Sequence, residues 1–198
     1  MKQQTWAVLM GTMLAAASGA AAAEGDAKRG AELAAACGGC HGETGNSEVP
    51  TFPKLAGQKA QYIVKQIADF QKGGRTDETM AGMAMGLTEK QDVLDIAAFY
   101  ASQPVMKGSA EGADAKALAK GKEIYLEFKC NTCHGDDGKG KGSLFPVIGG
   151  QHKDYLAKTL TDLKTDVRKN DTTMMMAPLA KKLNAKQIEA VAEYLSTL

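Results

Sequence analysis

Two short motifs hold all four cysteines of the chain and two of its three histidines. Each reads Cys-x-x-Cys-His-Gly, and the second follows the first by 93 residues. The motif residues are Cys37, Cys40 and His41, then Cys130, Cys133 and His134. Residues three apart lie on one face of a helix, about one turn from each other. A sulfur pair beside an imidazole could form a redox dithiol, bind zinc or attach a haem covalently.

Covalent haem attachment explains this motif better than the other two chemistries. A redox dithiol needs no following histidine, and the βαβ setting expected for it is missing from the sequence. A zinc ion shared by the four cysteines would leave both histidines and the repetition without a role. In a c-type site each thiol adds to one vinyl group of the haem, and the adjacent histidine ligates the iron. The sequence therefore predicts two c-type haems, one for each motif.

Methionine is predicted to be the second axial ligand of each iron. The candidates are Met80, Met83 and Met85 in the first half and Met174, Met175 and Met176 in the second. Counting back seven residues from the equivalent positions Leu87 and Leu183 gives Met80 and Met176. Met83 and Met174 are reserve candidates, and the others read as flexible core residues. The remaining histidine, His152, aligns with Lys59 and is expected at the surface.

Ligation by histidine and methionine has a functional consequence. A thioether favours ferrous iron and raises the reduction potential. With both axial positions filled, oxygen or peroxide has no place to bind. The chain is therefore expected to transfer single electrons rather than to catalyse a reaction.

The chain is an internal duplication. "FPKLAGQKAQYIVKQIADFQKGGR" begins at Phe52, and "FPVIGGQHKDYLAKTLTDLKTDVR" begins at Phe145 in the same register. We predict a first domain over residues 24–103, a Pro/Gly/Ala-rich linker over 104–116 and a second domain over 117–198. Apolar residues recur at helical spacing and show no strand-like alternation. Each domain is expected to be all-α, with three or four short helices.

Residues 1–23 have the pattern of a secretory signal peptide: "MKQQ", an apolar stretch, then small residues ending at Ala23. The protein is thus expected to act outside the cytoplasmic membrane. Residues 24–103 carry 8 basic and 11 acidic side chains, and residues 104–198 carry 15 and 12. This near-balance argues against a nucleic-acid-binding face. The opposite signs of the two halves, −3 and +3, could orient two different partners.

The two motifs, the repeated segments and a methionine ahead of each final helix resemble the dihaem cytochrome c4 family, which is built from two tandem class I cytochrome c domains. The resemblance implies a periplasmic, monomeric carrier that passes electrons from a cytochrome bc complex to a haem-copper terminal oxidase at the membrane surface. Two alternatives stay open: a dihaem peroxidase-like enzyme, and a cytochrome subunit docked to a larger oxidoreductase.

The same resemblance implies roles for residues around the haems. The carbonyls of Pro53 and Pro146 would accept the ring N–H of the ligating histidines. Gly30 and Gly121 would let each opening helix cross the final helix closely, near Phe99 or Tyr100 and near Tyr194. Four further residues repeat in register and could meet haem propionates, meet the interface between domains or simply be exposed to solvent: Gln58, Arg75, Gln151 and Arg168. The glycines precede the first cysteine by different distances, which predicts opening helices of different length.

Overall fold

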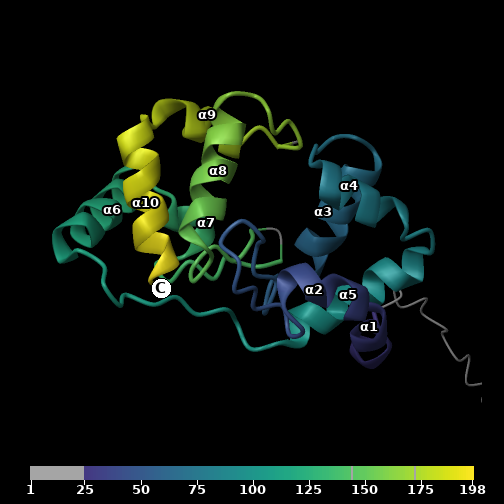
Figure 1. Ribbon diagram of the computed structural model, residues 1–198. Coiled ribbons are helices and arrows are strands. Elements are labelled where there is room, and N and C mark those ends of the chain that lie inside the picture. Colours follow the sequence, from purple (N-terminus) through teal and green to yellow (C-terminus); the bar gives the residue numbers. More distant parts are fainter. Residues whose placement is uncertain (1–24, 144, 172) are drawn as a thin grey trace, which may run out of the picture.

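The computed structural model describes residues 25–143, 145–171 and 173–198, and they form two helical lobes that lie side by side (Figure 1). The predicted signal peptide, residues 1–23, lies outside the described residues. No strand occurs in the described ranges, as the all-α prediction requires. The first lobe contains α1 (Ala27–Leu33), α2 (Ala35–His41), α3 (Ala60–Gln71), α4 (Glu78–Met85) and α5 (Lys90–Ser102). The second contains α6 (Ala115–Glu127), α7 (Asn131–His134), α8 (Lys153–Lys164), α9 (Met176–Lys182) and α10 (Ala185–Ser196).

Each lobe thus has five described helices, and the prediction of three or four was wrong. The additional helices are short: α2 and α7 carry cysteines of the two motifs, and α4 and α9 carry methionines. Their brevity leaves little room for an amphipathic period, which is why the sequence pattern did not reveal them. The opening helices do differ in length, as predicted, since α1 has 7 residues and α6 has 13.

Short polar side chains fix where several of these helices begin. The carboxylate of Asp26 accepts the N–H groups of Lys28 and Arg29 at the start of α1, and Asp114 does the same at the start of α6. At α10, Asn184 and Gln187 form a reciprocal capping box. Such caps satisfy backbone donors that have no partner within the helix. The local sequence therefore specifies the ends of the helices that frame each lobe.

In both lobes the opening helix crosses the final helix at a glycine. A Cβ atom added to Gly30 would lie 1.9 Å from the Asp95 carbonyl oxygen and 2.9 Å from the Phe99 Cβ. One added to Gly121 would lie 2.1 Å from the Ala190 oxygen and 2.6 Å from the Tyr194 Cβ. Only hydrogen fits in this space, so the prediction of a close crossing at these glycines is confirmed.

The two lobes carry their buried tyrosine at positions that are not equivalent in the repeat. In the first lobe Tyr100 of α5 packs in one cluster with Ala34, which follows Gly30 by four residues. In the second lobe Tyr125, four residues after Gly121, packs with Leu195 of α10. The Tyr100 and Leu195 carbonyls accept the N–H groups of Gly57 and Gly150, both at 2.8 Å, so these two positions are equivalent. Each lobe thus holds one buried tyrosine, which comes from the final helix α5 in the first lobe and from the opening helix α6 in the second.

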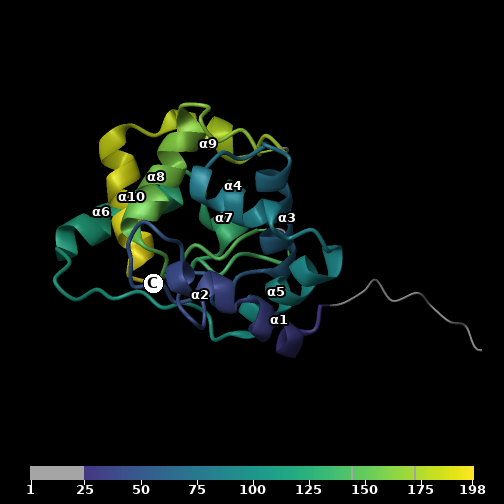
Figure 2. The same cartoon turned by 45° about the vertical axis from the view of Figure 1, so that its right-hand side comes forward.

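The predicted linker starts with a docked segment. Figure 2 shows it in teal, running from α5 beneath the second lobe to α6. Met106 is 3% exposed, and its N–H donates to the Ala56 oxygen at 3.1 Å. Two residues later the Gly108 N–H donates to the Leu198 oxygen at 2.7 Å. This segment therefore bonds first to one lobe and then to the other, while the division at residues 104–116 stays a prediction.

The close crossing at Gly30 gives a direct test. We expect Gly30→Ala to destabilise the protein by about 1–3 kcal/mol or more, because α1 and α5 must separate to admit the methyl group. Gly82→Ala in α4 is the matched control, since its Cβ would have no atom within 4 Å. That control should be neutral or slightly stabilising through helix propensity. Denaturant unfolding measures both, and equal effects of the two substitutions would contradict the crossing.

Candidate haem sites

Two buried histidines lie at the centre of the candidate sites. His41 ends α2 and is 6% exposed, and His134 ends α7 and is 5% exposed. The His41 Nδ1 lies 2.8 Å from the Pro53 oxygen, and the His134 Nδ1 lies 3.1 Å from the Pro146 oxygen. A carbonyl oxygen only accepts, so Nδ1 carries the proton in both rings and Nε2 keeps its lone pair. The predicted contacts with the two prolines are confirmed.

Both imidazoles are held in the neutral form. Burial lowers the pKa of His41 and of His134, although the hydrogen bonds to Pro53 and Pro146 act in the opposite direction. Neutral imidazole is the form that ligates a metal, and a second partner on Nδ1 fixes the ring's orientation. Each lobe therefore presents one oriented nitrogen donor.

The four cysteines belong to the same short helical segments as the two histidines. Cys37 and Cys40 lie in α2, Cys133 lies in α7, and Cys130 is the N-cap of α7. All four are half-buried and free of disulfides. Burial raises the pKa of Cys37, and it raises that of Cys130 to about 11. A thiol with a raised pKa forms little of the reactive thiolate at neutral pH, so these surroundings do not suit a reactive dithiol.

The arrangement also argues against a zinc site. Within residues 25–143, 145–171 and 173–198, no three His, Cys, Asp or Glu side chains come together as a metal-binding group. The two cysteine pairs are therefore not brought to one ion. A site with two thiols and one oriented imidazole fits a c-type haem, which needs two points of attachment and one nitrogen ligand.

A glycine after each histidine turns the chain sharply away from the motif. Gly42 and Gly135 both have φ of 78°, in the region that favours glycine. A Cβ on Gly42 would lie 2.5 Å from the Asn46 oxygen. The glycine of the motif is thus required by the backbone, which must return from the histidine towards the proline that orients it.

Burial divides the six candidate methionines. Met83, Met85, Met174 and Met175 are 46%, 62%, 75% and 44% exposed, so the expectation that the methionines outside the ligand pair are core residues was wrong. Met80 in α4 and Met176 at the start of α9 are half-buried, and Met80 packs against the core of the first lobe. The two methionines chosen by register are therefore the two with the most restricted surroundings.

The lobes meet through crossed contacts between equivalent residues. The Arg75 guanidinium donates to the Tyr155 hydroxyl at 2.8 Å, and Arg168 donates to the Tyr62 hydroxyl at 3.2 Å. The repeated arginines thus contribute to the interface, one of the three roles that the sequence left open. Sequence reasoning missed the tyrosines as interface residues, although their recurrence in register was a usable signal.

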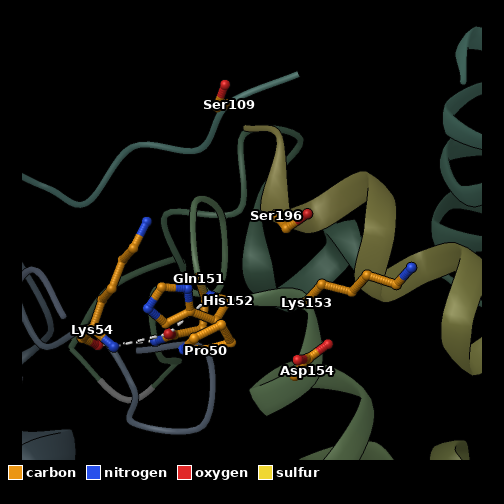
Figure 3. A pocket seen from close by; sticks show the side chains of 8 residues that line it. All are labelled: Pro50, Lys54, Ser109, Gln151, His152, Lys153, Asp154 and Ser196. Carbon is orange, nitrogen blue, oxygen red and sulfur yellow. Dashed lines mark hydrogen bonds between the residues drawn. The ribbon is translucent and has the colours of Figure 1, made fainter. Parts of the chain in front are cut away.

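His152 was expected at the surface, and this expectation was wrong. It is half-buried, and its Nε2 lies 2.9 Å from the Ser47 carbonyl oxygen of the first lobe. A hollow of about 330 Å³ opens beside it, lined by Pro50, Lys54, Ser109, Gln151, His152, Lys153, Asp154 and Ser196 (Figure 3). None of the residues that line this hollow belongs to the two cysteine motifs.

A helical lobe that sets two thiols beside a buried, oriented imidazole defines a c-type cytochrome domain, and the chain has two of them. The family model described as cytochrome c matches residues 27–103 and 118–198. Cytochrome c4 of Pseudomonas aeruginosa is 43% identical over 187 residues, covering 91% of this chain and 92% of that protein. A thiosulfate dehydrogenase electron acceptor of Stutzerimonas stutzeri is 32% identical, covering 83% and 80%.

The comparison with solved structures agrees. Reduced recombinant cytochrome c4 from Pseudomonas stutzeri superposes with a TM-score of 0.81 at 39% identity, covering 88% of this chain and 99% of that one. The chain belongs to the cytochrome c family and, within it, to the dihaem cytochromes c4. It is an electron carrier with two covalently bound c-type haems. Among the described residues, no helix is long and apolar enough to cross a membrane.

The two buried tyrosines should respond differently to loss of the hydroxyl. The Tyr125 hydroxyl donates to the Gly135 oxygen at 2.6 Å, whereas that of Tyr100 has only the weakly bonding Cys37 thiol as a neighbour in the described part of the chain. We expect Tyr125→Phe to cost about 1 kcal/mol, and Tyr100→Phe to cost less. Denaturant unfolding of the dihaem protein measures the difference. A larger loss for Tyr100→Phe would contradict the assigned hydrogen bonding.

Proposed function

We propose that this cytochrome is a periplasmic shuttle whose two haem irons are ligated by His41 and Met80 and by His134 and Met176. It takes electrons from a cytochrome bc complex and delivers them to a haem-copper terminal oxidase. The haem, when bound, supplies a one-electron change between ferric and ferrous iron. The chain's part is to attach each haem at two thiols, supply both axial ligands and keep each imidazole oriented.

The contrast in burial among the methionines carries this proposal. A ligand must be held in one place, and a methionine side chain exposed to solvent is not. Met80 and Met176 are half-buried, whereas the four alternatives are 44% exposed or more. Both also lie in the helix that precedes the final helix of their lobe, which gives the two sites the same order of ligands along the chain.

Full axial ligation favours a carrier over the peroxidase-like alternative, which needs a vacant or labile position. Relatives named cytochrome c4 support the same choice. The relative named as an electron acceptor of thiosulfate dehydrogenase supports a role in receiving electrons from another protein. The predicted leader of residues 1–23 supports export to the periplasm.

Replacing the methionines tests the ligand assignment. We expect Met80→Ala and Met176→Ala each to remove about half of the ferric far-red absorption band, and to lower the potential of one haem, because one of two thioether ligands is lost. Met83→Ala and Met174→Ala are the matched controls from the exposed set. Absorption spectra and a redox titration give both readouts. An unchanged band in Met80→Ala, or loss of the band in a control, would overturn the assignment.

The opposite charges of the two halves predict that donor and acceptor dock on different lobes. Glu43→Lys with Glu48→Lys reverses exposed charges of the first lobe, and Lys182→Glu with Lys186→Glu does so in the second. Each double variant should slow electron transfer with one partner by about tenfold at low salt and spare the other. Stopped-flow rates against ionic strength measure this. Equal slowing with both partners would contradict separate docking.

A further inference from the structure

Two glutamine side chains reach across the interface to the backbone of the opposite lobe. Gln151 accepts the Lys54 N–H at 2.8 Å and donates to the Lys54 oxygen at 2.9 Å (Figure 3). Gln58 accepts the Val147 N–H at 2.9 Å and donates to the Val147 oxygen at 2.8 Å. Gln58 and Gln151 are equivalent in the repeat, as are Lys54 and Val147. Each glutamine therefore forms the same pair of hydrogen bonds with the backbone of the equivalent residue in the other lobe.

Both amides are firmly held. Each glutamine is 4% exposed. The Gln58 oxygen also accepts the Lys59 N–H at 2.9 Å, and the Gln151 oxygen accepts the His152 N–H at 3.0 Å. A buried side chain with its oxygen and its nitrogen both bonded has one orientation. These contacts are thus built parts of the interface.

The residues bonded by the glutamines, Lys54 and Val147, directly follow the two prolines that orient the histidines. The carbonyl of Pro53 and the N–H of Lys54 belong to one peptide group, whose oxygen lies 2.8 Å from the His41 Nδ1 and whose N–H bonds Gln151. The peptide group of Pro146 and Val147 connects His134 to Gln58 in the same way. Because a trans peptide is planar, its C=O and N–H point in opposite directions. Each peptide group therefore bridges a histidine of one lobe and a glutamine of the other.

Hydrogen bonds in such a chain strengthen one another. When the peptide N–H donates a hydrogen bond, the C=O of the same peptide is polarised and its oxygen becomes a better acceptor, by about 10–30% per bond. A better acceptor on Nδ1–H raises the basicity of the imidazole. A more basic ligand favours ferric iron, so it lowers the reduction potential of the haem.

We propose that Gln58 and Gln151 are crossed positioning residues: Gln151 sets the potential of the haem in the first lobe, and Gln58 sets that of the haem in the second. The proposal rests on the proposed function, in which His41 and His134 ligate the two irons. It links the two potentials to the docking of the lobes.

Substitution of each glutamine by methionine tests the crossed effect. Methionine is of similar length and cannot reproduce the paired hydrogen bonds. Gln151→Met should raise the potential of the first haem, and Gln58→Met that of the second, by about a threefold change in the reduced-to-oxidised ratio. His152→Ala is the control, because it removes a different bond between the lobes, from Nε2 to the Ser47 oxygen. This substitution should not shift the potential of one haem relative to the other.

Nuclear magnetic resonance of dihaem protein carrying ¹⁵N-labelled histidine reports each ligand separately, since the chain has three histidines. His152→Ala identifies the signal of His152, and Met80→Ala, which alters the first site alone, distinguishes His41 from His134. In the reduced state the Nδ1–H signal of His41 should move in Gln151→Met, and that of His134 in Gln58→Met. A redox titration followed by the same method assigns the potentials. Equal shifts of both haems in both variants would reduce the glutamines to a docking role and overturn the proposal, as would no shift.

Two further measurements keep the outcome decisive. If a methionine variant does not accumulate as dihaem protein, Gln58→Asn and Gln151→Asn are measured instead, because they shorten the side chain by one methylene and lose its reach. The far-red band is recorded for every sample. Absence of the far-red band from the wild-type protein would contradict the proposed function. An intact band in the glutamine variants, together with unchanged potentials, would contradict this inference alone.

Discussion

The bond from each histidine Nδ1–H to a proline carbonyl is the contact around which the rest of the molecule is arranged. It fixes the tautomer of His41 and His134 and leaves Nε2 as the donor. The glycine after each histidine lets the chain turn back to make this bond, and the loop that follows continues into the interface between the lobes. One hydrogen bond per lobe thus connects the cysteine motif, the orientation of the ligand and the opposite lobe.

Duplication explains why the interface is made of crossed pairs. Two copies that dock face to face present the same surface to each other, so an arginine of one copy meets a tyrosine of the other and the reverse. The same holds for the glutamines and the backbone that they grip. The cores follow this symmetry less closely, because their buried tyrosines, Tyr100 and Tyr125, lie on helices that are not equivalent in the two lobes. Constraint is therefore strongest at the contacts that the two lobes share.

The sequence was most informative where function restricts residue type locally. The haem chemistry of the cysteine motifs and the all-α class followed from residue types and spacing, whereas the proline contacts and the crossings at Gly30 and Gly121 were implied by the resemblance to the dihaem cytochromes c4. It was least informative about the interface, because bonds such as Gln58 to Val147 join residues 89 apart and depend on how two folded lobes dock. The same limit misplaced His152, whose partner Ser47 lies in the other lobe. The short helices α2, α4, α7 and α9 were missed because few residues define their period.

The intact mass of the purified, denatured protein, followed by peptide mapping, tests the central claim most directly. Thioether bonds survive unfolding, so the chain should carry the added mass of two haems, one on the peptide with Cys37 and Cys40 and one on the peptide with Cys130 and Cys133. A chain from a host competent in haem attachment that carries no haem, or carries haem on other residues, would contradict the account.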